Sequence, residues 1–400
     1  GKLFKYLRKK MWKKNSRPAE TYENFMEIVK FCADIIGVNV LVPHYRINWR
    51  TRILLFAIIA YFLFSFYTIR NVDDNWIHIL GIIITTGAGF AGISKLCSGK
   101  RYAKQYYEVH ITMSNIYQKH QEIGQRYEEV LQTGCKRLRL VLRLVGLVYL
   151  QVVVLAAALP LLNMKFGDGK RYMIVFTEIP GLDVNTDFGY WSTFIAHEIW
   201  IIIACLGLYA SDTMIVVCLI NSLLYFDILR LKIEDLNDAV DQKMEKNKNE
   251  QNITKMLHDI VEWHQSYCAF TVKCNEIFFW PITLQISCST ASIILTLYII
   301  FTSTWPAAYA SLLYGINSLY EYCLLGTKCE IYNDQICDEI YNIHWYGLTI
   351  SQQKTVRVML TKAQSTDTIN IAGVMPLTVN TALGITRTIY SIFTMLLQFQ

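Results

Sequence analysis

Seven long apolar stretches constrain this chain more than any other feature of its sequence. They cover residues 51–69, 76–97, 139–163, 191–221, 276–302, 306–326 and 375–399. A helix needs about 20 apolar residues to cross about 30 Å of hydrocarbon, and each stretch is about that long or longer. Because a helix satisfies its backbone hydrogen bonds within one segment, it is the element such stretches form in lipid. The sequence therefore predicts an all-α integral membrane protein with seven transmembrane helices.

The composition excludes the main soluble classes. Charged residues make up 18% of the chain and hydrophobic residues 53%, whereas soluble domains carry about 25% charged residues. The net charge of +6 is modest, and a nucleic-acid-binding protein would gather its basic residues on one soluble face. We expect contact with membrane lipid and no nucleic-acid partner.

The distribution of lysine and arginine predicts the orientation, because loops rich in these residues stay in the cytoplasm. Segments 1–50, 98–138, 222–275 and 327–374 hold 29 of them, and the alternate segments 70–75, 165–188 and 303–305 hold 4. The N-terminus is therefore expected in the cytoplasm, and seven crossings place the C-terminus outside. Segment 1–50 has no apolar core of a secretory signal, and the sequon at Asn252 should stay unglycosylated.

The polar segments suggest four regions. These are a basic cytoplasmic segment at 1–50, helices one to six with cytoplasmic extensions at 51–326, cytoplasmic anchor helices at 327–374, and a final helix at 375–400. The first 14 residues suit either an interfacial helix or a flexible basic tail. Apolar residues at helical spacing predict a packed cytoplasmic bundle. They are Leu229, Ile233, Leu236 and Val240, then Ile253, Leu257, Ile260 and His264, and finally Ile331, Ile336, Ile340, Ile343, Val356, Met359 and Leu360.

Two short motifs look catalytic but lack the context that chemistry needs. Residues 87–92 read G-x-G-x-x-G, yet they lie inside an apolar stretch rather than between a strand and a soluble helix, so they indicate close helix packing. His197-Glu198 begins like a zinc-protease motif, but Ile201 occupies the place of the second histidine. The sequence predicts no enzyme, no catalytic residue, no metal and no cofactor.

Four charged residues inside the apolar stretches need a physical explanation, since each is costly in hydrocarbon unless it is paired or faces water. They are Arg143, Asp212, Glu321 and Arg387. Arg143 and Asp212 both lie toward the cytoplasmic end of their stretches and are expected to form a structural pair. Glu321 and Arg387 lie at matching depth and are predicted to contact each other; alternatively, Arg387 faces a water-filled vestibule or another subunit.

Aromatic and polar side chains gather in the outer half of several stretches. Interfacial tryptophan and tyrosine are ordinary membrane anchors, but deeper residues on shared helical faces suit a mostly apolar pocket for a small uncharged ligand. Its predicted lining consists of His78, Tyr149, Val153, Phe194, His197, Ile201, Tyr309, Leu313 and Tyr314.

The tail carries a family resemblance. Residues 372–377 read AGVMPL and residues 390–399 read YSIFTMLLQF. With a length near 400 and long internal segments after stretches two, four and six, the chain resembles the insect odorant receptors. The final Gln-Phe is similar to the close of the gustatory receptors, but Tyr390 lies too far before it for that pattern. The internal loop is too short to resemble the shared co-receptor, Orco, so the resemblance points to a ligand-tuned subunit.

The resemblance implies an odorant-gated, non-selective cation channel, in which tuning subunits assemble with Orco-like co-receptor subunits into a tetramer. It implies a volatile organic ligand among spans two, three, four and six, permeating cations, and the plasma membrane of olfactory sensory neurons. It also implies that the last helix lines the pore, with Met395, Gln398 and Phe399 resembling the gate and the polar ring.

Three alternatives stay open on the sequence alone. A metabotropic seven-helix chemoreceptor would have its N-terminus outside. A gustatory-receptor-like channel would be homomeric. A transporter would show inverted repeats with broken helices, and Pro281 alone is a weak breaker.

Overall fold

The computed structural model describes residues 17–38, 41–42, 46–71, 76–246, 250–365 and 369–398, and helices dominate them. The elements are α2 (Pro18–Ile36), α3 (Trp49–Asn71), α4 (Trp76–Arg101), α5 (Ala103–His120), α6 (Gln125–Phe166), α7 (Asp187–Lys246), α8 (Glu250–Thr302), α9 (Ala308–Tyr341), a short 3-10 turn (Trp345–Gly347), α10 (Ile350–Ala363), strands β1 (Asn370–Ile371) and β2 (Met375–Pro376), and α11 (Val379–Gln398). The predicted all-α class is confirmed. The amphipathic start of the chain lies outside the described residues.

Each of the seven predicted stretches falls in a separate helix, but the helices differ in character. Five of the described helices, α3, α4, α6, α7 and α8, are long and apolar enough to cross a membrane. Asn317 and Glu321 dilute α9, and Arg387 and four threonines dilute α11. The chain is thus a multi-pass helical membrane protein, while the count of seven crossings stays a prediction.

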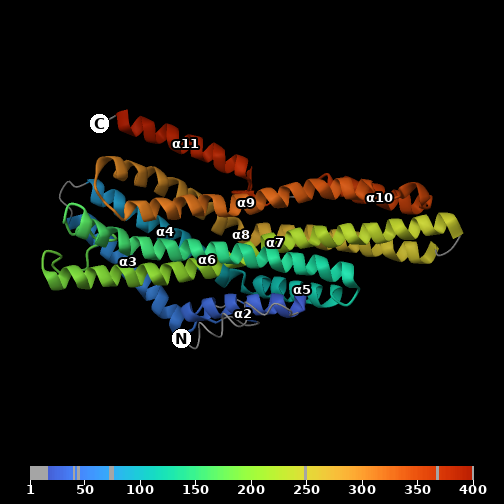
Figure 1. Cartoon of the computed structure of the whole chain (residues 1–400), viewed down its shortest axis with the longest axis horizontal. Helices are drawn as coiled ribbons and strands as arrows, with labels where there is room; N and C mark the ends of the chain where they lie inside the picture. The colour runs from blue at the N-terminus through green and yellow to red at the C-terminus, as the bar shows by residue number, and fades with distance from the viewer. Residues whose placement is uncertain are drawn as a thin grey trace.

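Several helices are far longer than a membrane is thick. α7 has 60 residues, which at 1.5 Å per residue is about 90 Å, or about three times the hydrocarbon thickness. Figure 1 shows α7, α8 and α9 with α10 running along the long axis of the molecule. We call the end that carries the α6–α7 loop the loop end, and the opposite end, which carries α10, the anchor end.

The apolar stripes predicted for the extensions are buried, so this packing prediction is confirmed. The exposed fraction is at most 1% for Leu236 and Val240 of α7 and for Ile253 and Ile260 of α8. α2 and α5 pack on the same bundle, and the rings of Tyr22 and Tyr117 stack with centroids 4.6 Å apart. The prediction was wrong at Ile331, which is exposed because the buried face of α9 there carries Asn333 and Ile336 instead.

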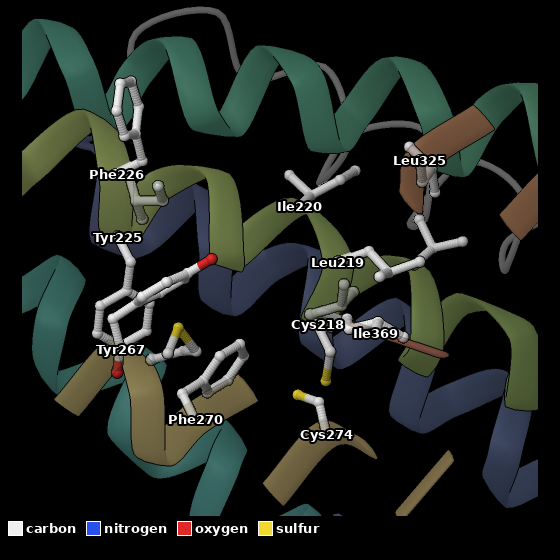
Figure 2. Packing of buried hydrophobic residues seen from close by; sticks show 14 of the residues in the cluster. Cys218, Leu219, Ile220, Tyr225, Phe226, Tyr267, Phe270, Cys274, Leu325 and Ile369 are labelled. Carbon is white, nitrogen blue, oxygen red and sulfur yellow. The ribbon is translucent and has the colours of Figure 1, made fainter. Parts of the chain in front are cut away.

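The core between α7 and α8 mixes aromatic rings with thiols. Figure 2 shows the sulfur atoms of Cys218 and Cys274 facing each other, with Tyr225, Tyr267 and Phe270 packed close by. All eleven cysteines are free thiols. These residues belong to a core that continues along both helices, from Cys205 to Val240 of α7 and from Ile253 to Ile293 of α8.

A tight turn separates the anchor end from the last helix. Strands β1 and β2 pair antiparallel, and Ala372 and Gly373 at the turn between them have φ values of 53° and 70°. α11 therefore begins at Val379, four residues after the predicted start of the stretch, and the Thr378 hydroxyl accepts a hydrogen bond from the Thr381 amide at 3.3 Å. This N-cap fixes where the helix starts.

Candidate functional site

A cavity of about 260 Å³ lies between α2, α3, α4 and α7. We call it the lateral cavity. Its walls are mainly apolar and include Ile58, Tyr61 and Phe62 of α3, Thr85, Ala88, Gly89 and Gly92 of α4, and His197, Trp200, Ile201, Ala204 and Leu208 of α7. A mostly apolar space with few polar groups suits a small uncharged ligand.

The glycine-rich stretch of α4 makes room for this cavity. Ala88, Gly89 and Gly92 line it, and a Cβ added at Gly89 would lie 3.1 Å from the Phe62 ring. Gly87 faces α8 instead, with Cys288 as its neighbour at 3.9 Å. The predicted role in close helix packing therefore fits Gly89, which lies close to Phe62 of α3, whereas Gly87 and Gly92 have no neighbour nearer than 3.9 Å.

The α6–α7 loop closes the loop end of the cavity. Residues 173–178, which we call the inserted loop, are held by hydrogen bonds to α3, to α7 and to the connection between α8 and α9. Trp305 Nε1 in that connection donates to the Met173 carbonyl at 3.0 Å, and the Glu178 amide donates to Thr68 Oγ1 of α3 at 2.8 Å. His197 Nε2 of α7 lies 2.8 Å from the Thr177 carbonyl oxygen. Val175 lines the cavity. The loop is thus part of the bundle rather than a surface connection.

Phe176 anchors the same loop by ring packing. Its ring centroid lies 4.6 Å from those of His78 and Trp305. Gly81 of α4 leaves the space this ring fills, since a Cβ there would lie 2.0 Å from Phe176 Cδ2. The predicted pocket residue His78 therefore packs on the inserted loop and does not line the cavity.

The nine predicted pocket residues do not converge on one space. His197 and Ile201 line the lateral cavity. Phe194 packs in a separate cluster with Tyr190, Ile174 and Ala310. Val153 and Tyr314 pack against the main core, and the Tyr149 hydroxyl donates a hydrogen bond to Asp212. On α9, Leu313 is half-buried and Tyr309 is exposed. Sequence spacing gives the depth of a residue along its helix, but packing decides which way each side chain faces.

A buried polar cluster lies where α4, α6, α7 and α9 meet. Asp212 forms an ion pair with Lys95 and accepts hydrogen bonds from the hydroxyls of Tyr149 and Tyr322, the latter at 2.6 Å. Lys95 and Asp212 are 5% and 1% exposed. Burial of the pair is tolerable because each carboxylate oxygen has a donor.

Two predicted charge contacts were wrong. The ion pair of Asp212 is with Lys95, not with Arg143, whose side chain is exposed on α6. Among the described residues no ion pair joins Glu321 to Arg387: Glu321 Oε1 is buried without a hydrogen-bond partner, and Arg387 is exposed on α11. Similar depth along α9 and α11 was not enough to bring the Glu321 and Arg387 side chains into contact.

Lys95 and the inserted loop were missed from the sequence, although signals for both existed. Lys95 is a charge two residues before the end of the stretch at 76–97, and it belonged with the other intramembrane charges. The run Met-Ile-Val-Phe at 173–176 is apolar within an otherwise polar connection. Such a run must be buried against something.

The last helix has one buried face and one open face. Ala382, Ile389 and Phe393 are buried, and the Phe393 ring lies 5.1 Å from that of Phe301. Leu383, Tyr390 and Met395 are exposed apolar residues, and Gln398 is exposed near the end of the helix. Figure 1 shows α11 at the edge of the bundle, beside α9. The third predicted pore residue, Phe399, lies outside the described residues.

Contacts tie α11 to α9. The Val379 amide donates to Thr327 Oγ1 at 2.8 Å, and the hydroxyls of Tyr320 and Thr386 lie 2.8 Å apart. A Cβ at Gly326 would lie 2.0 Å from the Leu377 carbonyl oxygen. Since Tyr322 on α9 also bonds Asp212, α9 connects the polar cluster to α11.

Known proteins resemble this chain along most of its length. The 7tm odorant receptor family matches residues 77–390. A putative odorant receptor 83c from Drosophila melanogaster is 27% identical over 389 residues, covering 95% of this chain and 98% of the relative. The olfactory receptor OR5 from Machilis hrabei has the same fold: its structure with eugenol gives a TM-score of 0.74 at 15% identity, and a second OR5 structure gives 0.71 at 14%, each covering 95% of this chain and 100% of the receptor. With the sequence resemblance, the helical membrane fold and the family match in agreement, this chain belongs to the 7tm odorant receptor family.

Proposed function

We propose that this protein is the odorant-sensing subunit of a heteromeric, ligand-gated, non-selective cation channel in the plasma membrane of olfactory sensory neurons. It assembles with Orco-like co-receptor subunits in a tetramer. The observation that carries the sensing role is the lateral cavity, an apolar space of about 260 Å³ under the inserted loop. Family membership supports odorant sensing, and the open face of α11 supports the channel.

The cavity favours an uncharged ligand. Lys95, the one lysine among the described lining residues, is already neutralised by Asp212, so an anionic ligand would have to compete with a buried carboxylate. The remaining lining is mostly alkyl and aromatic. Binding is then driven by burial of apolar surface, at about 25 cal/mol per Å².

The open face of α11 fits a pore lining. A helix that leaves Leu383, Tyr390 and Met395 exposed needs a partner or a pore on that side. In a tetramer, four copies of α11 would surround a common axis, with Met395 as an apolar constriction and Gln398 as a polar ring. Apolar rings close pores by dewetting, and an uncharged amide ring passes cations with little selection. Arg387 then faces the water-filled vestibule or a neighbouring subunit.

Coupling from cavity to pore runs through α4, the polar cluster and α9. Lys95 lines the cavity and pairs with Asp212, Tyr322 of α9 bonds the same carboxylate, and α9 holds the start of α11. A ligand that prefers one arrangement of these helices shifts the population of open pores by its differential affinity. If the ligand binds the open arrangement a few kcal/mol more tightly than the closed one, the ratio of open to closed pores changes by orders of magnitude.

Whole-cell current recording tests this proposal. The chain is expressed with and without an Orco-like co-receptor, its surface expression is measured, and an odorant panel is applied. We expect odorant-evoked cation currents only with the co-receptor. Odorant-evoked currents from this chain alone would favour a homomeric, gustatory-receptor-like channel, and second-messenger signals without direct currents would favour a metabotropic receptor. Epitope tags at each end test the orientation, with the N-terminus expected inside and the C-terminus outside.

A further inference from the structure

The lateral cavity is long and narrow. Its lining on α7 runs from His197 to Ile215, which at 1.5 Å per residue is about 27 Å, close to the hydrocarbon thickness of about 30 Å. A volume of about 260 Å³ spread over that length has the shape of an extended alkyl chain. Toward the anchor end the lining also includes Ala33, Leu41 and Tyr106, beyond the part under the inserted loop that suits an odorant.

α3 is fixed to the bundle near its two ends. Close to its start the Thr51 hydroxyl donates to the Gly37 carbonyl at 2.6 Å, and toward its other end the hydroxyls of Ser65 and Thr177 lie 3.3 Å apart. Thr51 and Ser65 are both buried, whereas no residue at positions 52–64 is buried. The middle of α3 therefore stands off the bundle.

The gap lies in the part of α3 nearer the anchor end. Within the described residues, the ring and hydrogen-bond contacts of this stretch with α4 begin at Tyr61 and Phe62, which meet Thr85 and Phe90. The cavity-lining residues before them, at positions 54, 57 and 58, each keep part of their surface accessible. Because α3 is a membrane-spanning helix, the medium that reaches these side chains is lipid.

A basic side chain stands at the anchor-end mouth of this gap. Arg50 lies one helical turn before Leu54, on the same face of α3, and its Nη1 donates to the Asp34 carbonyl at 2.7 Å. Asp34 directly follows Ala33, which lines the cavity. Arg50 is exposed and forms no ion pair with any described residue. Its remaining N–H groups can bind a phosphate, and the exposed Trp49 beside it is typical of the headgroup level.

We infer that this part of the lateral cavity binds an anionic phospholipid, with one acyl chain between α3, α4 and α7 and the phosphate beside Arg50. Charge complementarity favours an anionic headgroup, since Arg52 and Arg101 are also exposed where α3 begins and α4 ends. Anionic lipids are concentrated in the cytoplasmic leaflet, the side on which we expect these residues. The acyl chain supplies the dispersion contacts that the walls of an empty gap would lack.

A photoreactive phosphatidylserine with a diazirine in its acyl chain tests this site. The purified full chain is placed in phosphatidylcholine nanodiscs that contain the probe, and labelled residues are mapped by mass spectrometry after illumination. We expect more label at Leu54, Ala57 and Gly92, which line the cavity, than at Phe56 and Ile59, which are exposed on α3 outside it. Unlabelled phosphatidylserine should compete about fivefold better than phosphatidylcholine, the factor expected for one basic residue near an anionic lipid.

Two variants block the gap from opposite walls. Ala57→Phe fills it from α3 and should reduce labelling of the lining several-fold. Ala60→Phe is the matched control, because Ala60 lies on the same helix but does not line the cavity. Gly92→Val fills the gap from α4, where an added Cβ meets no atom nearer than 4.0 Å. The melting temperature in phosphatidylcholine nanodiscs identifies any variant that fails to fold.

Three further variants test the headgroup contact. Arg50→Gln should remove the preference for phosphatidylserine over phosphatidylcholine, whereas Arg50→Lys keeps the charge and should preserve it. Arg70→Gln is the control, since Arg70 is an exposed arginine near the other end of the same helix and meets the same probe in the opposite leaflet of the nanodisc.

The outcomes separate this inference from the channel proposal, which it goes beyond. Equal labelling of the lining and of the exposed α3 residues, or labelling that both blocking variants leave unchanged, would overturn the lipid site. A phosphatidylserine preference that survives in Arg50→Gln would overturn the headgroup contact. Specific labelling of a chain that gives no odorant-evoked current with the co-receptor would support the lipid site and overturn the channel proposal, and currents without specific labelling would do the reverse.

Discussion

Lys95 of α4 and Asp212 of α7, 117 positions apart in the chain, form a buried ion pair in the bundle. The hydroxyls of Tyr149 and Tyr322 complete the coordination of the carboxylate. Lys95 lines the lateral cavity, and Asp212 is bonded to Tyr322 of α9. Loss of the pair should therefore affect both the stability of the fold and gating.

Removing one partner of this pair should destabilise the protein by about 3 to 5 kcal/mol, because the remaining charge is buried without compensation. We expect Lys95→Met and Asp212→Asn each to lower the melting temperature and the surface expression, and the double variant to be more stable than Asp212→Asn alone. Lys100→Met is the control, since Lys100 is exposed on the same helix. A double variant as damaged as the sum of both singles would count against the pairing.

The space at Gly81 should control the position of the inserted loop. Gly81→Ala places a Cβ 2.0 Å from the Phe176 ring, so the ring must move away from His78 and Trp305. Overpacking of this kind costs about 1 to 3 kcal/mol, and we expect lower thermal stability and a several-fold change in odorant potency. Gly87→Ala should do neither, because its nearest neighbour is 3.9 Å away. Matching behaviour of the two variants would refute a special role for the loop.

Close approach at Gly326 should couple α9 to α11. The atom that a new Cβ would meet is the Leu377 backbone oxygen, at 2.0 Å, and backbone cannot rotate away as a side chain can. Gly326→Ala is therefore expected to displace the start of α11 and to shift the odorant concentration for half-maximal current, measured with the co-receptor. Gly384→Ala adds its methyl group where no atom lies within 4 Å, and it should behave like the wild type.

The polar ring proposed at Gln398 should tune ion selectivity. Gln398→Glu puts a carboxylate at each copy of this position, and a ring of negative charge favours divalent over monovalent cations. Reversal potentials in mixed calcium and sodium solutions should shift toward calcium permeability while odorant potency stays the same. Gln364→Glu adds the same charge at an exposed position after α10 and should leave the reversal potential unaltered. An unaltered potential in Gln398→Glu would remove this residue from the pore.

Acid should destabilise the protein through His110 on α5. Burial, followed by the nearby Lys30 ammonium, lowers the pKa of His110 from 6.5 to about 4, and Lys30 Nζ lies 3.0 Å from its Nε2. Between pH 6.5 and 4 the histidine is therefore protonated in the unfolded chain but neutral in the folded chain. The free energy of unfolding is highest above pH 6.5 and falls as the pH is lowered toward 4.

The check is the melting temperature between pH 7.5 and 5. We expect His110→Gln to flatten the fall relative to the wild type, because glutamine does not titrate. His258→Gln, at an exposed histidine, should keep the wild-type profile. A wild-type fall that persists unchanged in His110→Gln would assign the acid sensitivity to other groups.

Local features of the chain were predictable because they depend on neighbouring residues. Apolar stretches must form helices in hydrocarbon, where the backbone has no water to bond, and each of the seven stretches contains most of a helix or of its apolar part. Periodic apolar residues such as Leu236 and Ile260 mark the buried face of an extension, since helical spacing alone decides which side chains share a face.

Partners across the fold were not predictable in the same way. Asp212 was marked by its charge, but Lys95 became its partner only because α4 and α7 pack side by side at that depth. His197 was marked by its depth, yet the cavity it lines opens toward α3 and α4 rather than toward α6 and α9. The sequence by itself determined the membrane class, the helices and the few polar residues that needed an explanation. Only the tertiary structure decided which of these residues meet, because helix rotation and neighbour choice are set by packing between segments far apart in the chain.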